Sequence, residues 1–456
     1  MSPAFDYDLV CIGSGPAGQR AAVQAAKLGK RVAVVEKQRC VGGVCIETGT
    51  IPSKTFREAV RSFSAHRTRP GEDRAGRVRP TMPQLLERVA SVIRREGDVV
   101  RDQLARNEID LVRGRASFLE PHALRIESLE GVRTLTAEYV LIAVGTRPTD
   151  PPGVRPDGST VILSDNVLEL EKLPRTMVVV GGGVIGIEYA SMFAALGVQV
   201  TIVDKRPRPL EFVDQEIVDE LIHQMRKSDV TFRGGEAVES IEISEGPPRR
   251  GVIQLASGKH LVADLVLFSV GRAGATESLD LEKVGLQADE RGRLQVDAQF
   301  RTAVPHIFAA GDVIGYPALA ATSSEQGRLA AEPMAPNFPI GVYAIPEISM
   351  VGATEEELTR GRVPYETGIA RFNEIARGQI LGDHGGMLKM LFHAETRRLL
   401  GIHCIGTGAT ELVHVGQAVL ALGGGLDYFL HTVFNYPTLA ECYKVAALDA
   451  SNKLRY

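Results

Sequence analysis

The chain has 456 residues and a formal net charge of −4, so it is too long for one ordinary core and is close to charge balance. This length predicts roughly two to four domains, and the lack of a Lys/Arg cluster argues against a nucleic-acid partner. Five cysteines without regular spacing argue against a secreted disulfide framework. They favour the reducing cytoplasm, in agreement with a start that lacks signal-peptide regions.

The first elements are a strand, a glycine-rich turn, a helix and a second strand. Residues 8–12 predict a short buried strand, and an Ala-rich helix then runs to Lys27. The second strand, residues 31–35, is followed by an acidic side chain. The glycines of the turn follow Gly-x-Gly-x-x-Gly, which in this context predicts a dinucleotide site. The expected contact residues are Gly13, Gly15, Gly18 and Glu36.

Residues 42–54 form the next distinctive stretch, Gly-Gly-Val-Cys-Ile-Glu-Thr-Gly-Thr-Ile-Pro-Ser-Lys. Cys45 and Thr50 are separated by four residues in it, and Lys54 ends it. Cys40 also stands four residues before Cys45, so a Cys40–Cys45 redox pair is an interpretation that the spacing alone allows.

An exposed loop and a long helix are expected after this stretch. Residues 64–85 are rich in Arg and Pro and predict the loop. Residues 83–107 carry apolar side chains at helical spacing, which predicts a helix packed on the first domain.

The strand, turn, helix and strand recur from residue 177, with the acid at the same distance from the last glycine. The apolar run 177–203 is long enough to suggest a membrane helix, but the repeat explains it as a strand, a helix and a strand. We therefore expect no membrane span. The second set of contact residues is Gly181, Gly183, Gly186 and Asp204, followed by Lys205, Arg206 and Arg208.

Two such units predict two dinucleotides. In each, the first glycine makes the tight turn, the second lets backbone approach the pyrophosphate, and the third lets the helix pack on the strand. The helix N-terminus faces the phosphates, and the distal acid hydrogen-bonds a ribose diol. An acid favours NAD while nearby Arg favours the 2′-phosphate of NADP, so the second unit carries both preferences. Together with the stretch of residues 42–54, the two copies point to a flavin and a nicotinamide dinucleotide.

Residues 42–54 and the two fingerprints resemble the flavoprotein disulfide reductases, the class I pyridine nucleotide-disulfide oxidoreductases. The resemblance extends to residues 143–148, 269–272 and 302–312. It implies an α/β fold with two Rossmann-like dinucleotide-binding domains, the NAD(P) domain inserted in the FAD domain, and a C-terminal α+β interface domain. The implied ranges are 1–150 and 275–340 for the FAD-binding domain, 151–274 for the NAD(P)-binding domain and 341–456 for the interface domain.

The resemblance also implies cofactors, partners and further contacts. It implies one FAD per subunit, NAD(H) and NADP(H) as substrates, no metal, and a homodimer or higher homo-oligomer. In the family, the Asp that ends the segment 302–312 holds the ribityl chain of the flavin. The residues that these motifs add to the expected cofactor site are Gly43, Cys45, Thr50, Lys54, Gly145, Gly271, Gly311 and Asp312.

Two positions depart from the disulfide reductases. In the family register, Gly-Gly precedes the first redox cysteine, so Cys40 lies outside the pair and the second position is Thr50. The family's proton-transferring His near the C-terminus is replaced by Tyr436, although the later Glu is kept as Glu441. A phenol titrates near a pKa of about 10 and is a poor proton shuttle at neutral pH. The electrons are therefore expected to reach a different acceptor.

Together with the resemblance, these departures imply a flavoprotein that transfers hydride between NADPH and NAD⁺ through FAD in a ping-pong scheme. By the resemblance, the catalytic residues are Lys54, near the flavin N5, and Glu188, its partner in the second fingerprint helix. One alternative is an oxidase, peroxidase or quinone reductase that uses Cys45 as a lone redox thiol. Another is a non-catalytic nucleotide-binding protein. The residues expected to pack in or near the interface domain without a chemical role are Cys404, Cys442 and His414.

Overall fold

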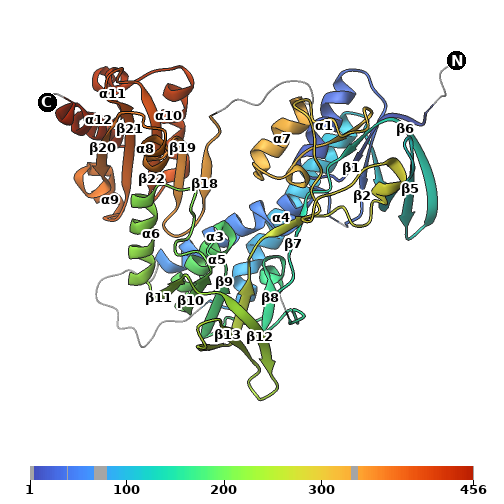
Figure 1. Cartoon of the computed structure of the whole chain (residues 1–456), viewed down its shortest axis with the longest axis horizontal. Helices are drawn as coiled ribbons and strands as arrows, with labels where there is room; N and C mark the ends of the chain where they lie inside the picture. The colour runs from blue at the N-terminus through green and yellow to red at the C-terminus, as the bar shows by residue number, and fades with distance from the viewer. Residues whose placement is uncertain (1–4, 39, 66–79, 152, 330–336, 455–456) are drawn as a thin grey trace.

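Three sheet-centred units lie one beside the next in the computed structural model, with the unit that contains β1 and the unit that contains α12 at opposite sides of the view (Figure 1). The structure describes residues 5–38, 40–65, 80–151, 153–329 and 337–454. In each of two units, one parallel strand leads through a glycine turn into a helix, and the sheet of the third unit is antiparallel. This arrangement confirms the predicted fold class.

The first unit is a seven-stranded sheet with the order β3-β2-β1-β6-β5-β4, and β17 pairs with β6. β1 is parallel to β2 and β6, and β17 joins from late in the sequence, also parallel to β6. Every residue of β2 is buried, as expected for a covered parallel strand. Helices α1 and α7 pack against each other beside this sheet (Figure 1). The bounds are β1 Tyr7–Ile12, α1 Pro16–Lys27, β2 Val32–Glu36, β3 Asp110–Arg113, β4 Arg115–Glu120, β5 Ala123–Ser128, β6 Gly131–Ile142, β17 Ile307–Ala309 and α7 Ala320–Leu329.

The second unit is a parallel sheet with the order β11-β10-β9-β15-β8. Its helix α5 is buried throughout Gly186–Ala194, so the apolar run from residue 177 is a strand, a buried helix and a strand, as predicted. No helix in the described ranges is long and apolar enough to cross a membrane. The bounds are β8 Val161–Leu163, β9 Thr176–Val180, α5 Val184–Ala195, β10 Gln199–Asp204, α6 Gln215–Lys227, β11 Val230–Gly234 and β15 Leu265–Phe268, with an antiparallel cover of β12 Val238–Ser244, β13 Arg250–Leu255 and β14 His260–Ala263.

The third unit is an antiparallel sheet with the order β18-β19-β22-β21-β20. Cys404 and Cys442 are buried in its core, as expected, whereas His414 is exposed on α10 rather than packed in the core. The bounds are β18 Ile340–Val342, β19 Ile348–Gly352, α8 Glu355–Arg360, β20 Tyr365–Arg371, α9 Ala376–Leu381, β21 Met387–His393, β22 Leu399–Ile405, α10 Ala409–Ala421, α11 Leu426–His431 and α12 Glu441–Lys453.

Short elements connect the units. The chain leaves and re-enters the first unit through two paired antiparallel strands, β7 and β16. The remaining elements are β7 Thr146–Pro148, β16 Arg272–Gly274, α2 Val44–Glu47 and the 3₁₀-helices Ser164–Glu169, Leu281–Val284, Asp312–Ile314 and Phe372–Glu374.

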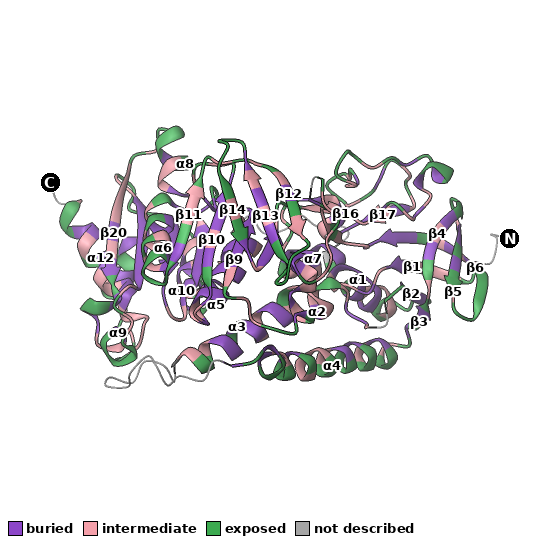
Figure 2. Ribbon diagram, turned by 90° about the horizontal axis from the view of Figure 1, so that it is seen from below, coloured by how far each residue is buried: buried purple, intermediate pink, exposed green. Residues whose placement is uncertain are grey.

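Two long helices, α3 Thr50–Ala65 and α4 Met82–Arg106, run side by side along one edge of the molecule (Figure 2). The expected loop 64–85 is wrong at both ends, because residues 64–65 end α3 and because Met82 and Leu85 are buried residues of α4. The helix expected over residues 83–107 is confirmed as α4, which a capping box between Thr81 and Gln84 starts one residue earlier, at Met82. Most of the expected loop, residues 66–79, lies outside the described residues.

A buried ion cluster joins the second and third units. Lys389 of β21 is 2% exposed, and its ammonium lies 2.9 Å from Asp214, 3.0 Å from Glu216 and 2.6 Å from Glu355. Burial alone would lower the pKa of Lys389, but the bonds to Glu355 and Asp214 raise it overall. Asp214 caps the N-terminus of α6, so the cluster fixes this helix against the third sheet.

Candidate active site

The turn between β1 and α1 is built so that glycine is required at its first and last positions. Gly13 has φ +109°, and a Cβ atom there would stand 2.3 Å from the carbonyl oxygen of Ala143. A Cβ on Gly18 would stand 2.0 Å from the carbonyl oxygen of Gly13. A Cβ on Gly15 would meet nothing within 4 Å. The start of α1 is therefore open where a pyrophosphate would approach.

The turn between β9 and α5 has the same construction. Gly181 also has φ +109°, and its Cβ would stand 2.6 Å from the carbonyl oxygen of Ser269. A Cβ on Gly186 would stand 1.9 Å from the carbonyl oxygen of Gly181, whereas one on Gly183 would meet nothing within 4 Å. Both fingerprints thus combine a crowded helix-to-strand contact with an open middle glycine.

Glu36 links the first fingerprint to the stretch that follows it. Its buried carboxylate accepts hydrogen bonds from the backbone N–H and the hydroxyl of Ser14, at 3.1 and 2.5 Å, and from the backbone N–H of Gln38 at 2.8 Å. The Ser14 hydroxyl accepts a further bond, 2.8 Å long, from the backbone N–H of Gly42. The acid at the end of β2 therefore also fixes the position of the Gly-Gly turn.

One cavity of about 920 Å³ opens between the three units, and this size suits a cofactor site. It collects residues from both fingerprint regions, from residues 43–54 and from the start of the third unit. Its lining contains the expected site residues Gly13, Gly15, Glu36, Gly43, Cys45, Thr50, Lys54, Gly145, Glu188, Gly311 and Asp312. Among the described residues, the other predicted site residues do not line this cavity: Gly18, Gly181, Gly183, Gly186, Asp204, Lys205, Arg206, Arg208 and Gly271.

The Cys45 turn stands directly on the first fingerprint. Gly43 has φ +62°, and a Cβ there would stand 2.9 Å from the Cα of Gly15. α2 begins at the next residue and carries Cys45, and Thr50 stands at the start of α3. Burial raises the pKa of Cys45, and the nearby Thr50 side chain lowers it by less. Cys40 and Cys45 are both free, so the Cys40–Cys45 disulfide that spacing alone allowed is absent from the described structure.

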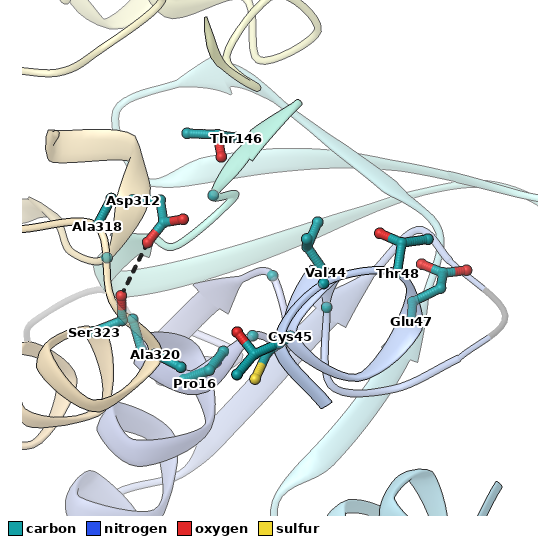
Figure 3. Close-up of a pocket in the computed structure, with 18 of the residues that line it drawn as sticks. Pro16, Val44, Cys45, Glu47, Thr48, Thr146, Asp312, Ala318, Ala320 and Ser323 are labelled. Atoms are coloured by element: carbon teal, nitrogen blue, oxygen red, sulfur yellow. Dashed lines mark hydrogen bonds between the residues drawn. The ribbon is translucent and has the colours of Figure 1, made fainter. Parts of the chain in front are cut away.

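Asp312 lies on the opposite wall of the cavity from the Cys45 turn (Figure 3). Its carboxylate accepts a 3.2 Å hydrogen bond from the Ser323 hydroxyl of α7, and burial raises its pKa. The backbone N–H of Gly311 donates to the side chain of Gln326, one turn further along α7, at 2.8 Å. Helix α7 therefore positions the two residues that the sequence assigned to this wall.

Lys54 and Glu188 form the predicted pair. The ammonium of Lys54 on α3 donates to both oxygens of Glu188 on α5, at 2.9 and 2.7 Å. The Glu188 side chain is 4% exposed and that of Lys54 is 26% exposed. The third unit completes the arrangement, because the backbone N–H of Tyr343 donates to Glu188 at 2.8 Å and its ring centre lies 4.9 Å from the Lys54 ammonium. All three residues line the cavity.

The acid of the second fingerprint is held by its own neighbour. Asp204 accepts two guanidinium bonds from Arg206, at 3.0 and 2.6 Å, and a backbone bond from the same residue at 2.8 Å. Burial would raise the pKa of Asp204, but these bonds lower it overall. Arg208 pairs with Asp219 at 3.0 Å, and Lys205 is exposed. The structure therefore separates three basic residues that the sequence presented as one group.

The remaining sequence-predicted positions lie at the junctions. Gly145 has φ +64° and Gly271 has φ +137°, and a Cβ on either would meet nothing within 4 Å. Tyr436 is 68% exposed and lies outside the cavity lining among the described residues. One oxygen of Glu441, Oε2, is buried without a hydrogen-bond partner in the described structure.

Sequence reasoning missed the residues that attach the third unit to α3. Arg57, one turn after Lys54, donates to the backbone carbonyl of Ala344 at 3.0 Å and lies 3.7 Å from the Glu347 carboxylate. Glu347 in turn accepts bonds from the Gly408 N–H and the Thr410 hydroxyl, at 2.7 and 2.6 Å. A basic residue at helical spacing from Lys54 was the available signal, but it does not reveal a partner so distant in sequence.

The described residues fit an FAD. The open middle glycine at the start of α1 leaves room for a pyrophosphate beside helix N–H groups. The buried Asp312 carboxylate has one described side-chain partner, Ser323, and can accept further hydroxyl donors such as those of a ribityl chain. Within the described residues, no group of His, Cys, Asp and Glu could hold a metal ion.

Comparison with known proteins gives consistent matches over the whole chain. The family model described as pyridine nucleotide-disulphide oxidoreductase matches residues 7–327, and its dimerisation-domain model matches residues 338–447. The chain is 53% identical to the soluble pyridine nucleotide transhydrogenase of Mycobacterium tuberculosis, over 99% of this chain and 98% of that protein. It is 44% identical to the protein of the same name from Klebsiella pneumoniae, over 100% of each.

Solved structures show the same architecture. The HOCl-induced flavoprotein disulfide reductase RclA from Escherichia coli is 28% identical, with a TM-score of 0.87 over 97% of this chain and 99% of that chain. LpdA from Mycobacterium tuberculosis is 25% identical, with a TM-score of 0.88 over 96% and 98%.

Proposed function

The chain belongs to the pyridine nucleotide-disulphide oxidoreductase family, and from this premise we propose that it is a Si-specific NAD(P)⁺ transhydrogenase. It transfers hydride between NADPH and NAD⁺ through one FAD per subunit. The names of the relatives support this proposal. The observation that carries it is Thr50, whose side chain contacts Cys45 where a redox pair would need a second thiol, next to an intact Lys54–Glu188 pair.

We assign the two dinucleotides to the two fingerprints. FAD binds the domain formed by residues 1–150 and 275–340, and the nicotinamide dinucleotide binds residues 151–274. The FAD contacts are Gly13, Gly15, Gly18, Glu36, Gly43, Cys45, Thr50, Lys54, Gly145, Gly311 and Asp312. The nicotinamide dinucleotide contacts are Gly181, Gly183, Gly186, Glu188, Asp204, Lys205, Arg206, Arg208 and Gly271. Supporting this division, the large cavity contains most of the first set, and the second turn repeats the first.

When bound, FAD supplies the hydride chemistry. Lys54 supplies a fixed positive charge at the cavity wall, which favours negative charge that develops next to it. Glu188 and the Tyr343 ring hold that ammonium in place before any reaction, so little reorganisation is needed. Cys45 stays a thiol because burial raises its pKa, and a thiol is a poor nucleophile.

Two further features complete the proposal. One nicotinamide pocket serves both half-reactions, so the two substrates bind in turn in a ping-pong scheme. Residues 341–456 form the interface domain of a homodimer or higher homo-oligomer, supported by the dimerisation-domain match. The five free cysteines suit an enzyme of the reducing cytoplasm.

The test is hydride transfer from NADPH to thio-NAD⁺ by the FAD-loaded protein, without any added electron acceptor. We expect sustained turnover and parallel lines in double-reciprocal plots of two-substrate kinetics, as a ping-pong scheme requires. Lipoamide, oxidised glutathione and mercuric ion serve as control acceptors and should give no turnover. Robust reduction of any of them would overturn the assignment.

Two further measurements separate the rivals. An oxidase would consume oxygen and produce peroxide at a rate comparable to the transfer rate, and this activity would fall when Cys45 is replaced by Ser. A non-catalytic nucleotide-binding protein would bind NADPH without reducing FAD under anaerobic conditions. Either result would replace the transhydrogenase proposal.

A further inference from the structure

The carboxylate of Asp204 is completely occupied by hydrogen bonds. It is 5% exposed at the end of β10. Oδ1 accepts from the backbone N–H and the Nε of Arg206, at 2.8 and 3.0 Å. Oδ2 accepts from the backbone N–H of Gly182 at 2.5 Å and from Nη2 of Arg206 at 2.6 Å. A carboxylate offers about four acceptor sites, so none remains for a ligand.

This occupancy conflicts with the role of the acid in binding NAD(H). A ribose diol donates hydroxyl hydrogen bonds to the carboxylate and therefore needs free acceptor sites. If the guanidinium of Arg206 moves away, one site opens on each oxygen, and the backbone bonds from Gly182 and Arg206 remain. The adenosine ribose of NAD(H) can therefore engage Asp204 only when the Arg206 side chain has been displaced.

The Arg206 side chain can make this move. It is 36% exposed, and its described hydrogen bonds from the guanidinium both go to Asp204. The negative charge of Glu211 also acts on it and helps to raise its pKa. Arg208 and Lys205, the other bases of the segment, leave Asp204 uncovered, because Arg208 pairs with Asp219 and Lys205 is exposed.

The two nucleotides differ in what they offer the displaced side chain. A 2′-phosphate is a bidentate acceptor that matches the planar guanidinium. NADP(H) therefore replaces the Asp204 contact of Arg206 with a phosphate contact. NAD(H) removes the same contact and supplies no anion in its place.

We propose that Arg206 is a reversible cover on Asp204, which weakens NAD(H) binding and is transferred to the 2′-phosphate when NADP(H) binds. This inference rests on the proposed function, since it places the nicotinamide dinucleotide at the second fingerprint. One side chain thereby brings the affinities of both nucleotides closer together, which suits an enzyme that must bind each of them in turn.

The test is the replacement Arg206→Met, which keeps an aliphatic stem and removes the guanidinium. Dissociation constants for NAD⁺ and NADP⁺ are measured by calorimetry on the FAD-loaded protein. We expect NADP⁺ binding to weaken about ten- to a hundredfold, as for a lost charge-assisted contact. NAD⁺ binding should tighten by roughly two- to fivefold, the range for loss of a partly exposed ion pair. Weaker NADP⁺ binding together with tighter NAD⁺ binding is the result that a cover on Asp204 predicts.

Three further variants make the result decisive. Arg208→Met removes a guanidinium that does not touch Asp204, so NAD⁺ binding should not tighten. Arg226→Met, at the exposed end of α6, removes the same charge elsewhere and should leave both constants unchanged. Arg206→Lys keeps a cation beside Asp204, so NAD⁺ binding should stay near the wild-type value while NADP⁺ loses its bidentate contact.

The outcomes distinguish failure of the cover from failure of the proposed transhydrogenase function. If the wild-type protein binds both nucleotides and Arg206→Met leaves NAD⁺ binding unchanged or weaker, the cover is refuted and the transhydrogenase proposal stands. If the wild-type protein binds neither nucleotide, the proposed function and the cover both fail. If NAD⁺ binding tightens in Arg206→Met alone, the cover is supported.

Discussion

The charge on Lys54 is the feature whose removal tests the proposed active site most directly. Lys54→Met keeps the length of the side chain and removes the ammonium that donates to both oxygens of Glu188. The carboxylate is 4% exposed, so it loses its main partner without gaining water. The Tyr343 N–H then remains as its described hydrogen-bond donor.

The expected magnitudes follow from this geometry. A hydrogen bond to a charged group contributes about 1.5–3 kcal/mol to the free energy of unfolding. The loss should stay below the 3–5 kcal/mol or so typical of a broken, fully buried pair, because the Lys54 side chain is 26% exposed. For catalysis, losing one preorganised electrostatic group costs about 10²- to 10³-fold in rate. We therefore expect flavin reduction by NADPH to slow at least about a hundredfold.

Anaerobic stopped-flow reduction of the bound FAD measures this step separately from NADPH binding. The limiting rate should fall in Lys54→Met while the dissociation constant of NADPH changes little, because the charge acts on the reacting atoms. Glu188→Gln should lose less, since an amide oxygen can still accept from Lys54 and Tyr343. Lys30→Met, an exposed position between α1 and β2, is the control for lost charge. An unchanged limiting rate in Lys54→Met, or a loss confined to NADPH affinity, would refute the reasoning.

Three other predictions address the glycine turn before α1, the thiol of Cys45 and the ion cluster between the second and third units. Gly15→Ala should fold normally but retain less FAD, because its Cβ would enter the open space that the pyrophosphate approaches. Gly18→Ala should lower the melting temperature of the apoprotein, because its Cβ would stand 2.0 Å from a carbonyl oxygen. Equal melting temperatures for the two apoproteins would contradict this reasoning. Cys45→Ser should keep transfer within about threefold, and a loss of a hundredfold or more, about 2.7 kcal/mol, with FAD bound would favour a redox thiol. Lys389→Met should lower the free energy of unfolding in urea by about 3–5 kcal/mol, because Asp214 would remain buried without its cation. The pKa of Asp214 is lowered in the folded protein, so its contribution to the free energy of unfolding is fully present above the ordinary Asp pKa of about 3.9 and is lost as pH falls through the lowered pKa. The difference in stability between the wild-type protein and Lys389→Met should therefore vanish in acid.

The parts of the fold that repeat a local pattern were predictable from sequence. Each strand, glycine turn and helix is encoded within a short segment, and steric contacts such as that of Gly186 with Gly181 leave no alternative residue. The Lys54–Glu188 contact was also predicted, although the two residues are far apart in sequence, because a family resemblance supplied the pairing. Burial and charge alone would not have chosen Glu188 among the acidic residues of the chain.

Contacts made by loops and by side-chain choice were not predictable in the same way. The expected loop 64–85 ran too far because its Arg- and Pro-rich composition concealed the capping box at Thr81, although the helix expected from residue 83 begins only one residue earlier, at Met82. The pairing of Arg206 with Asp204 was missed because the sequence suggested a group of bases directed at a phosphate, while in the structure the nearest anion is in the protein itself. The sequence shows which charged side chains are present, but which of them pair depends on how the folded backbone places them.

The position of Tyr343 shows why the active pair cannot be understood from α3 and α5 alone. Its backbone N–H reaches Glu188 where the third unit is docked on α3 and α5. Arg57 of α3 donates to the carbonyl of Ala344 and approaches Glu347, and the backbone N–H of Ile345 donates to the Ser191 hydroxyl of α5. The position of the Lys54 ammonium at the cavity wall therefore depends on contacts between units that lie outside the site. Substitutions at these contacts should change the rate of hydride transfer without contacting either nucleotide, because they alter the distance and orientation at which Glu188 holds Lys54.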